Sequence, residues 1–289
     1  AVAVDRSTAR RGLLPPAFRT PAGELAPWAA APLRRVLALV VVWAVLWIGV
    51  FAPLGLVGQS LPPRLDELGA PQLFFLHLLF VAALATWYFL GFSGAARDRV
   101  QGVPGWMAQF GFRAVGIWRE VGLGLVAGIG AWLCVLGVLL LVGAAIWSLG
   151  GEEMLPKEPP ALIPWIVALP IGLRLALSLS AGLVEEAFFR GFLQPRAGIP
   201  LSTLLFVLAH ASYGQPLMLV GITLLSIVYA LLVRWRQNIW PAIAAHALFD
   251  ALQLLVVIPK ALELLPRGGE EGSMPLALSA LCLAVGPIC

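Results

Sequence analysis

The sequence predicts an all-α, polytopic membrane protein with about eight transmembrane helices in one bundle and a polar site inside the membrane. Three observations predict this class. Only 12% of the 289 residues are charged, whereas soluble domains carry about 25%. The mean hydropathy is +0.92. Several apolar runs also exceed the roughly 18 residues that indicate a bilayer span.

The chain begins with a segment that differs in composition from the rest. Residues 1–33 are rich in Arg, Pro and Ala and contain no apolar stretch of the signal-peptide type. We expect this segment to be a flexible or surface-lying cytoplasmic arm. A single transmembrane domain is then expected over residues 34–289, and its first span would act as an uncleaved signal-anchor.

Eight apolar runs are candidate spans: 34–57, 72–92, 119–147, 162–194, 199–213, 217–233, 239–258 and 274–289. Pro164 and Pro170 interrupt the fourth, so a short or kinked entry segment should precede a continuous helix from about residue 172. The fifth and eighth are short, which indicates burial in the bundle or a truncated end. The glycines of GLGLVAGIGAWL in the third favour close helix packing.

The basic residues predict the orientation, because cytoplasmic loops carry an excess of Lys and Arg. A cytoplasmic N terminus puts most of them inside: Arg6, Arg10, Arg11, Arg19, Arg34, Arg35, Arg97, Arg99, Arg113, Arg119, Arg196, Arg234 and Arg236. Only Arg64, Lys157, Lys260 and Arg267 then lie outside. We therefore expect a multi-pass protein of the cell membrane with both termini cytoplasmic. Its partners would include membrane lipids and no nucleic acid, since topology accounts for the net charge of +4.

The fourth span contains three charged residues within LVEEAFFRGFL. A charge at the bilayer centre costs roughly 2.5–3.5 kcal/mol on insertion scales. Glu186 and Arg190 are four residues apart, so on a helix they lie on one face and can pair. Glu185 points about 100° away around the helix and stays available for another task. The alternative is a structural ion pair with a spare acid.

Two later spans contain histidines. His210 lies one turn after Phe206 in the fifth, and His246 lies one turn before Asp250 in the seventh. Each could be structural: a packed histidine in the first case and a His–Asp hydrogen bond in the second. Counted from the cytoplasmic ends, however, Glu185, His210, His246 and Asp250 are about 14, 16, 10 and 16 Å deep. This agreement predicts one polar layer that is reached from the cytoplasmic side.

The remaining intramembrane polar groups are expected to lie outside this layer. Arg174 should snorkel to the outer interface about 16 Å away. His77, in FFLHLLF near the start of the second span, is expected to be structural and in the outer half. Cys134, Cys282 and Cys289 form neither a metal-type pair nor a disulfide framework.

A carboxylate with two histidines permits two mechanisms. A glutamate and a histidine can activate water for attack on a carbonyl, while the other histidine stabilises the oxyanion. Alternatively, the histidines and an acid bind zinc, and the metal activates the water. The residues leave both open, although the HExxH pattern of helical zinc proteases is absent.

Three motifs, in order, resemble those of the CPBP intramembrane peptidases, which include the type II CAAX prenyl endopeptidase and bacteriocin-processing and immunity-type membrane proteins. EEAFFRG at 185–191 resembles EExxxRG, Phe206 and His210 resemble FxxxH, and His246 and Asp250 resemble HxxxN/D. The resemblance covers roughly residues 160–260. It implies that residues 34–289 form a peptidase domain with this segment as its motif core.

The resemblance also implies roles for single residues. Glu185 would be the general base, assisted by His210, and His246 would help to form the oxyanion hole. Glu186 and Arg190 would be supporting residues, with Phe206 in the second motif. Asp250 stands where the CAAX enzyme has Asn, and an ionised Asp cannot donate a hydrogen bond to an oxyanion. We expect Asp250 to orient His246; the alternative is a protonated Asp250 in the oxyanion hole.

The function expected on this basis is an intramembrane endopeptidase of the glutamic type that needs no cofactor, with a zinc-dependent version as the alternative. Its substrate would be a membrane-associated peptide or protein that approaches from the cytoplasmic side, including CAAX-type prenylated proteins where these exist. Two other hypotheses are a non-catalytic membrane scaffold or immunity protein of the same fold and a transporter that uses the polar layer as a proton relay.

Overall fold

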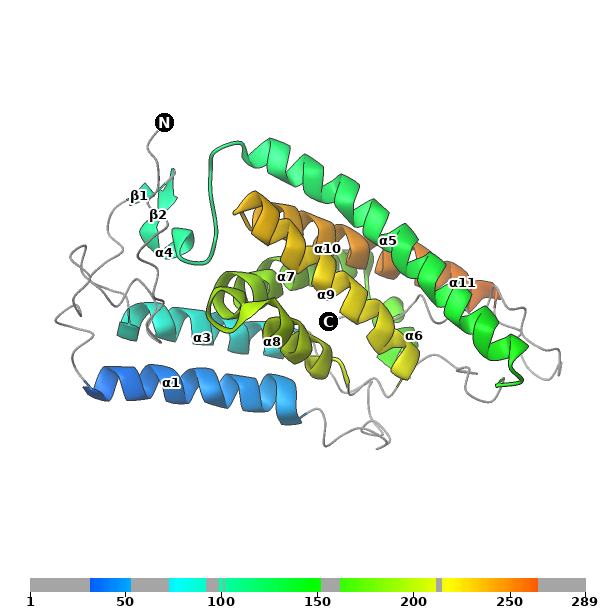
Figure 1. The fold of residues 1–289 in the computed structure, drawn as a ribbon, viewed down its shortest axis with the longest axis horizontal. Coiled ribbons are helices and arrows are strands. Elements are labelled where there is room, and N and C mark those ends of the chain that lie inside the picture. Colours follow the sequence, from blue (N-terminus) through cyan, green and yellow to red (C-terminus); the bar gives the residue numbers. More distant parts are fainter. Residues whose placement is uncertain are drawn as a thin grey trace.

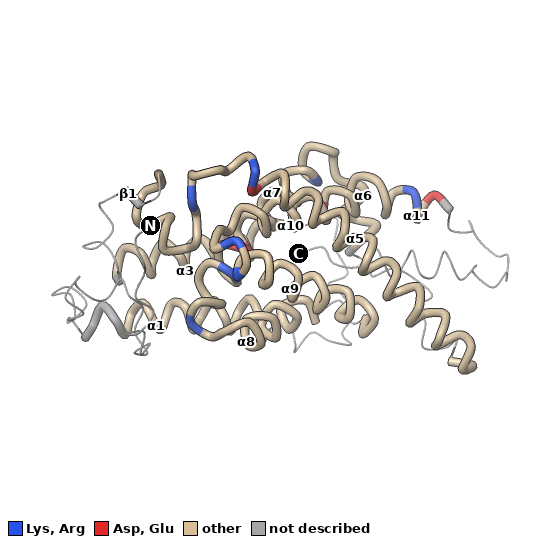
Figure 2. Tube along the Cα trace, turned by 45° about the horizontal axis from the view of Figure 1, so that its top comes forward, with Lys and Arg blue, Asp and Glu red and all other residues tan. Residues whose placement is uncertain are grey.

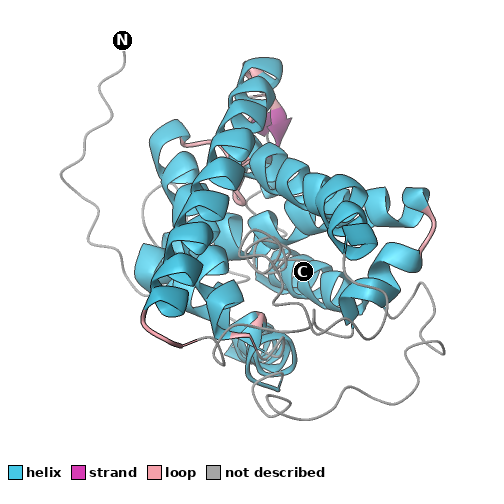
Figure 3. Cartoon of the chain, turned by 90° about the vertical axis from the view of Figure 1, so that its right-hand side faces the viewer, coloured by secondary structure: helices cyan, strands magenta, loops and turns pink. Residues whose placement is uncertain are grey.

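The computed structural model describes residues 32–52, 73–91, 99–100, 102–151, 162–211 and 215–264. Nearly all of these residues are helical (Figure 3), apart from loops and a small hairpin of β1 (Arg99–Val100) and β2 (Val103–Pro104). The predicted all-α class is confirmed. The expected arm lies almost entirely outside the described residues, and so does the eighth candidate span, 274–289.

The other candidate spans correspond to helices, which Figure 1 shows in chain order. The first two are α1 (Pro32–Leu46) with the π-helix η2 (Trp47–Phe51), and α3 (Phe75–Gly91). The short α4 (Gly105–Ala108) precedes the third span, which is α5 (Ile117–Ser148). The fourth and fifth spans correspond to α6 (Leu162–Ala168), α7 (Ile171–Glu185), the π-helix η6 (Glu186–Leu193) and α8 (Gln194–Ala209). The sixth span is α9 (Pro216–Arg236), and the seventh comprises α10 (Trp240–Leu252), the π-helix η8 (Gln253–Val257) and α11 (Ile258–Leu264).

Four helical stretches are long and apolar enough to cross a membrane: Ile117–Ser148, Ile171–Ala209, Pro216–Arg236 and Trp240–Glu263. Val36–Phe51 and Phe75–Leu90 are shorter apolar helices. Lys and Arg occupy only short stretches of the chain, and α5 carries no charge beyond its first turn (Figure 2). The described residues therefore form a multi-pass membrane protein.

Proline divides the fourth span as predicted, because α6 ends before Pro170 and α7 begins directly after it. The continuous helix expected from about residue 172 is present, because α7, η6 and α8 follow one another without a break, but the helix type changes along it. At Glu186 the chain enters η6, a π-helix of eight residues, and all eight are buried. Since π-helical segments occur frequently at functional sites, this change of helix type marks the acidic motif as unusual.

The chain reverses direction within α8. Gly198 has φ +81°, which is the left-handed region that glycine adopts without strain, and Pro200 follows it. After the reversal, Ser202 donates a hydrogen bond from Oγ to the carbonyl of Phe189 at 2.8 Å, and Phe206 packs edge-on against the Phe189 ring. The second half of α8 therefore runs back along η6. About 11 residues span about 16 Å, too short for a full crossing, as the length of the fifth candidate span indicated.

Helix α10 lies between α5, α7 and α9, and α5 runs along it (Figure 1). Small residues allow this contact. A Cβ on Gly124 of α5 would overlap the Pro241 carbonyl and lie 2.8 Å from the Ala244 Cβ. A Cβ on Gly182 of α7 would lie 2.8 Å from the Ala247 nitrogen. The close packing predicted for the glycine-rich third span is confirmed.

We expect Gly124→Ala to destabilise the protein by about 1–3 kcal/mol, because the new methyl group meets backbone atoms that cannot move aside cheaply. Gly130→Ala is the matched control, since a Cβ at Gly130, on the same helix, meets nothing within 4 Å. Unfolding free energies in detergent micelles measure the difference. Equal stability of the two variants would contradict the assigned α5–α10 contact.

Candidate active site

The structure brings the predicted site residues together from four helical segments. Glu185 ends α7, Glu186 and Arg190 lie in η6, and the others come from α8, its C-terminal end and α10. None of them is more than 4% exposed: Glu185, Glu186, Arg190, Phe206, His210, His246 and Asp250. The polar layer predicted from helix depth is therefore a single buried cluster.

Glu186 and Arg190 form the predicted ion pair, with 3.0 Å between Oε1 and Nη1. Arg190 also donates to the Ser226 hydroxyl of α9 at 3.0 Å, and its guanidinium lies 4.1 Å from the centre of the Phe206 ring. A buried guanidinium is favoured by such hydrogen-bonded and cation–π partners. Arg190 thus joins η6 to both α8 and α9.

Glu186 has a second partner that the sequence analysis missed. The Nδ1 atom of His246 lies 2.9 Å from Glu186 Oε1, the same oxygen that pairs with Arg190. The His246 ring stacks on Tyr229 with centroids 5.1 Å apart, and its Nε2 lies 3.5 Å from Asp250 Oδ2. Glu186 therefore orients His246 at closer range than Asp250 does.

His210 is held by its own helix. Its Nδ1 lies 2.6 Å from the carbonyl oxygen of Phe206, one turn earlier. Because a carbonyl only accepts, Nδ1 carries the proton and Nε2 is the basic nitrogen of the neutral ring. His210 and His246 both interact electrostatically with Glu185. Both histidines therefore lie within electrostatic range of the Glu185 carboxylate.

A third histidine lies at the site, contrary to expectation. His77 of α3 is 4% exposed, and its Nε2 lies 3.4 Å from Glu185 Oε1. Its Nδ1 lies 2.8 Å from the hydroxyl of Ser180 on α7. The expectation that His77 lies in a separate outer layer is wrong, because the first turn of α3 packs against the C-terminal part of α7, at Ser180 and Glu185. The number of residues from a helix end therefore does not give the same depth for His77 in α3 as for Glu185 in α7.

The second carboxylate oxygen of Glu185 is chemically available. Oε2 is buried and has no hydrogen-bond partner among the described residues. An ionised carboxylate oxygen only accepts hydrogen bonds, so the groups that suit this position are donors such as water. Within the described ranges, no group of three or more His, Cys, Asp or Glu side chains has the arrangement of a metal site. The absence of a cofactor stays a prediction.

Arg174 does not extend freely toward an outer interface as expected. It is partly buried and donates from Nη1 to the carbonyl of Leu254 in η8 at 2.9 Å. A π-helix displaces carbonyls from the regular α-helical pattern, and this side chain provides one of them with a donor. Arg174 is therefore a link between α7 and η8, and it lies outside the cluster.

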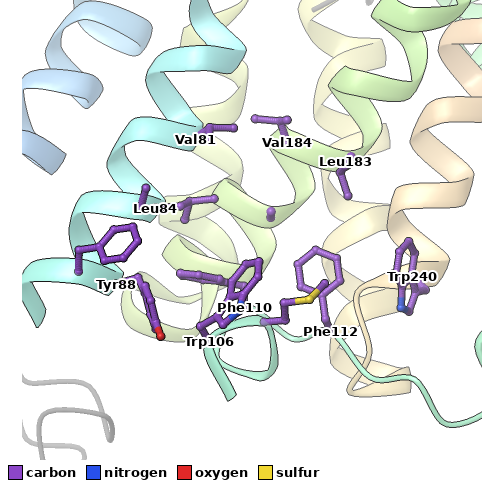
Figure 4. A pocket seen from close by; sticks show the side chains of 13 residues that line it. Val81, Leu84, Tyr88, Trp106, Phe110, Phe112, Leu183, Val184 and Trp240 are labelled. Atoms are coloured by element: carbon purple, nitrogen blue, oxygen red, sulfur yellow. The ribbon is translucent and has the colours of Figure 1, made fainter. Parts of the chain in front are cut away.

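An apolar pocket of about 690 Å³ lies beside the acidic segment (Figure 4). Leu183 and Val184, which directly precede Glu185, form part of its wall, and Ala187 forms another part. The α3 residues that form the opposite wall include Val81, Leu84 and Tyr88. Aromatic side chains from other segments close one end: Trp106, Phe110, Phe112 and Trp240. The sequence analysis did not find this pocket, because its lining comes from segments far apart in the chain.

Comparisons with known proteins match the part of the chain that carries the motifs. The family model described as "Type II CAAX prenyl endopeptidase Rce1-like" matches residues 167–252. This segment contains every predicted site residue but not His77. The predicted resemblance to the CAAX endopeptidase family is therefore confirmed over this segment.

One curated relative and the solved structures complete the comparison. The "Uncharacterized protein YpbD" of Bacillus subtilis (strain 168) is 31% identical over 77 residues. This similarity covers 26% of the chain and 41% of the relative, so the chain spans about two fifths of the length of the curated relative that it matches. No solved structure gives a significant match.

We expect Arg190→Leu to destabilise the protein by about 3–5 kcal/mol, because it removes the guanidinium from the buried Glu186 carboxylate and leaves His246 as its remaining partner. The double variant Glu186→Gln/Arg190→Leu should recover part of this loss, since no unpaired charge remains. Lys260→Ala is the control, because the Lys260–Glu263 pair is exposed and its loss should cause no measurable change. Chemical unfolding in detergent tests all three. A double variant that is less stable than Arg190→Leu would contradict this account.

Proposed function

We propose that this protein is an intramembrane endopeptidase that hydrolyses peptide bonds of membrane-associated substrates. The observation that carries the proposal is the state of Glu185. It is a buried carboxylate with one oxygen facing His77, one oxygen without a partner among the described residues, and two further histidines acting on its charge. The family match over residues 167–252 supports the same reaction.

In the proposed reaction, Glu185 is the general base. Its Oε2 takes a proton from a water molecule, and Nε2 of His210 accepts a second hydrogen bond from that water. The water oxygen attacks the peptide carbonyl carbon and forms a tetrahedral intermediate. Glu185 then returns the proton to the leaving nitrogen, and the C–N bond breaks to give a carboxylic acid and an amine.

His246 would stabilise the oxyanion of that intermediate. Glu186 holds the Nδ1 side of the ring at 2.9 Å, and Asp250 faces Nε2 at the longer distance of 3.5 Å. A proton on Nε2 can therefore be redirected to a substrate oxygen, while Asp250 orients the ring in the absence of substrate. In this proposal Glu186, Arg190 and Phe206 fix the helix geometry and touch no substrate.

The pocket beside Leu183 and Val184 suggests how a substrate would lie. Its walls are almost entirely apolar, and it borders the segment that carries Glu185. An apolar part of the substrate, such as a prenyl group or a run of apolar side chains, would lie there while the peptide bond reaches Glu185. We further propose that the substrate approaches from the cytoplasmic side of the cell membrane, with lipids around the bundle and both termini in the cytoplasm.

We expect Glu185→Gln to abolish cleavage and leave the protein folded, because the amide cannot accept the proton of the attacking water. Glu263→Gln is the matched control, since Glu263 is exposed on α11 and pairs there with Lys260. Comparative peptidomics of cells that carry either variant would identify the substrates, and purified protein would confirm direct cleavage. Cleavage by a well-folded Glu185→Gln protein would refute the proposal.

We also propose that the reaction requires no metal ion. Full activity should then survive exhaustive chelation, and the purified protein should contain no stoichiometric metal. A stoichiometric zinc ion that is lost when His210 or His246 is replaced by alanine would instead favour the zinc-dependent mechanism. Activity restored only by added zinc would lead to the same conclusion.

A further inference from the structure

His77 is a buried polar residue in an otherwise apolar helix. It is 4% exposed, its ring lies 6.0 Å from the Phe74 ring, and each ring nitrogen faces one group of α7. Ser180 lies 2.8 Å from Nδ1, and Oε1 of Glu185 lies 3.4 Å from Nε2. A buried histidine with two such partners has a fixed ring orientation.

The chemistry of the partners decides where the proton of a neutral ring lies. An ionised carboxylate can only accept, whereas a serine hydroxyl can donate or accept. Nε2 must therefore carry a proton to face Glu185 favourably, and Nδ1 then accepts from the Ser180 hydroxyl. The resulting chain of donors runs from Ser180 through His77 to Glu185, so it leaves α7, crosses to α3 and returns to α7.

This chain distinguishes the two carboxylate oxygens of Glu185. Oε1 faces His77, whereas Oε2 has no partner among the described residues. A general base acts efficiently only when its accepting oxygen is held in the productive direction, and a displacement of 1 Å can cost about 100-fold in rate. A donor that fixes Oε1 also fixes the direction in which Oε2 points.

We propose that His77 is a positioning residue, which holds the Glu185 carboxylate so that Oε2 faces the water that is activated. This inference rests on the proposed peptidase function, and it assigns a role outside the segment matched by the family model. His77 also shares one helical face with Val81, Leu84 and Tyr88, at intervals of four, seven and eleven residues. These three residues line the pocket, so the helix that positions Glu185 also forms a wall for the substrate.

Steady-state kinetics of purified variants tests the role in catalysis. We expect His77→Leu to lower kcat about 10- to 100-fold with little change in KM, because the base is misdirected while substrate contacts remain. His77→Gln should recover much of this loss, since the glutamine amide nitrogen can donate to Oε1. Ser180→Ala should give an intermediate loss. Leu78→Ala is the control, because Leu78 is the next residue of α3 and is 59% exposed.

A spectroscopic test separates this inference from the proposed function. The chain has three histidines, so ¹⁵N-histidine NMR resolves each ring once His→Gln variants assign the signals. We expect His77 to carry its proton on Nε2 and its signals to shift in both Glu185→Gln and Ser180→Ala. Unshifted His77 signals in these variants, or full kcat in a folded His77→Leu protein, would overturn the inference. If the wild-type protein cleaves no peptide, the proposed function is refuted, and the spectra alone decide the His77 contact.

Discussion

A carboxylate that is entirely removed from water must be neutralised where it lies, and Glu186 imposes this constraint on the whole site. Its Oε1 is shared between Arg190 of the same π-helix and His246 of α10, and Arg190 reaches on to Ser226 of α9. One buried charge thus fixes the register of three helices. The position of Glu185 at the junction of α7 and η6 follows from that register.

Short-range patterns made much of the site predictable. Residues four apart are neighbours on an α-helix, so Glu186 with Arg190 and His246 with Asp250 could be paired from sequence alone, and the structure contains both pairs. The approximate ends of the helices could be predicted from the apolar runs and from the positions of the prolines. The sequence also predicted that the motifs meet, because each motif lies at a similar number of residues from the expected cytoplasmic end of its span.

Contacts between distant helices could not be predicted in the same way. The polar partners of His77 are Ser180 and Glu185, which lie about a hundred residues later in the chain. The shared use of Glu186 by Arg190 and His246 depends on how closely α10 approaches η6. The π-helix could not be predicted from hydropathy, because the pattern of apolar residues does not distinguish a buried π-helix from a buried α-helix. Its formation depends on the packing around it, and the depth of α3 depends likewise on its neighbours.

The reversal at Gly198 has a consequence for how this sequence can vary. Glu185 and His210 are brought together by two helical arms of nearly equal length, with 13 residues before Gly198 and 12 after it. An inserted or deleted residue in either arm would rotate one side chain by about 100° and shift it by about 1.5 Å relative to the other. We therefore expect related sequences to tolerate insertions outside this hairpin far more readily than inside it. The number of residues between Glu185 and His210 is therefore as strict a requirement of this geometry as the two side chains themselves.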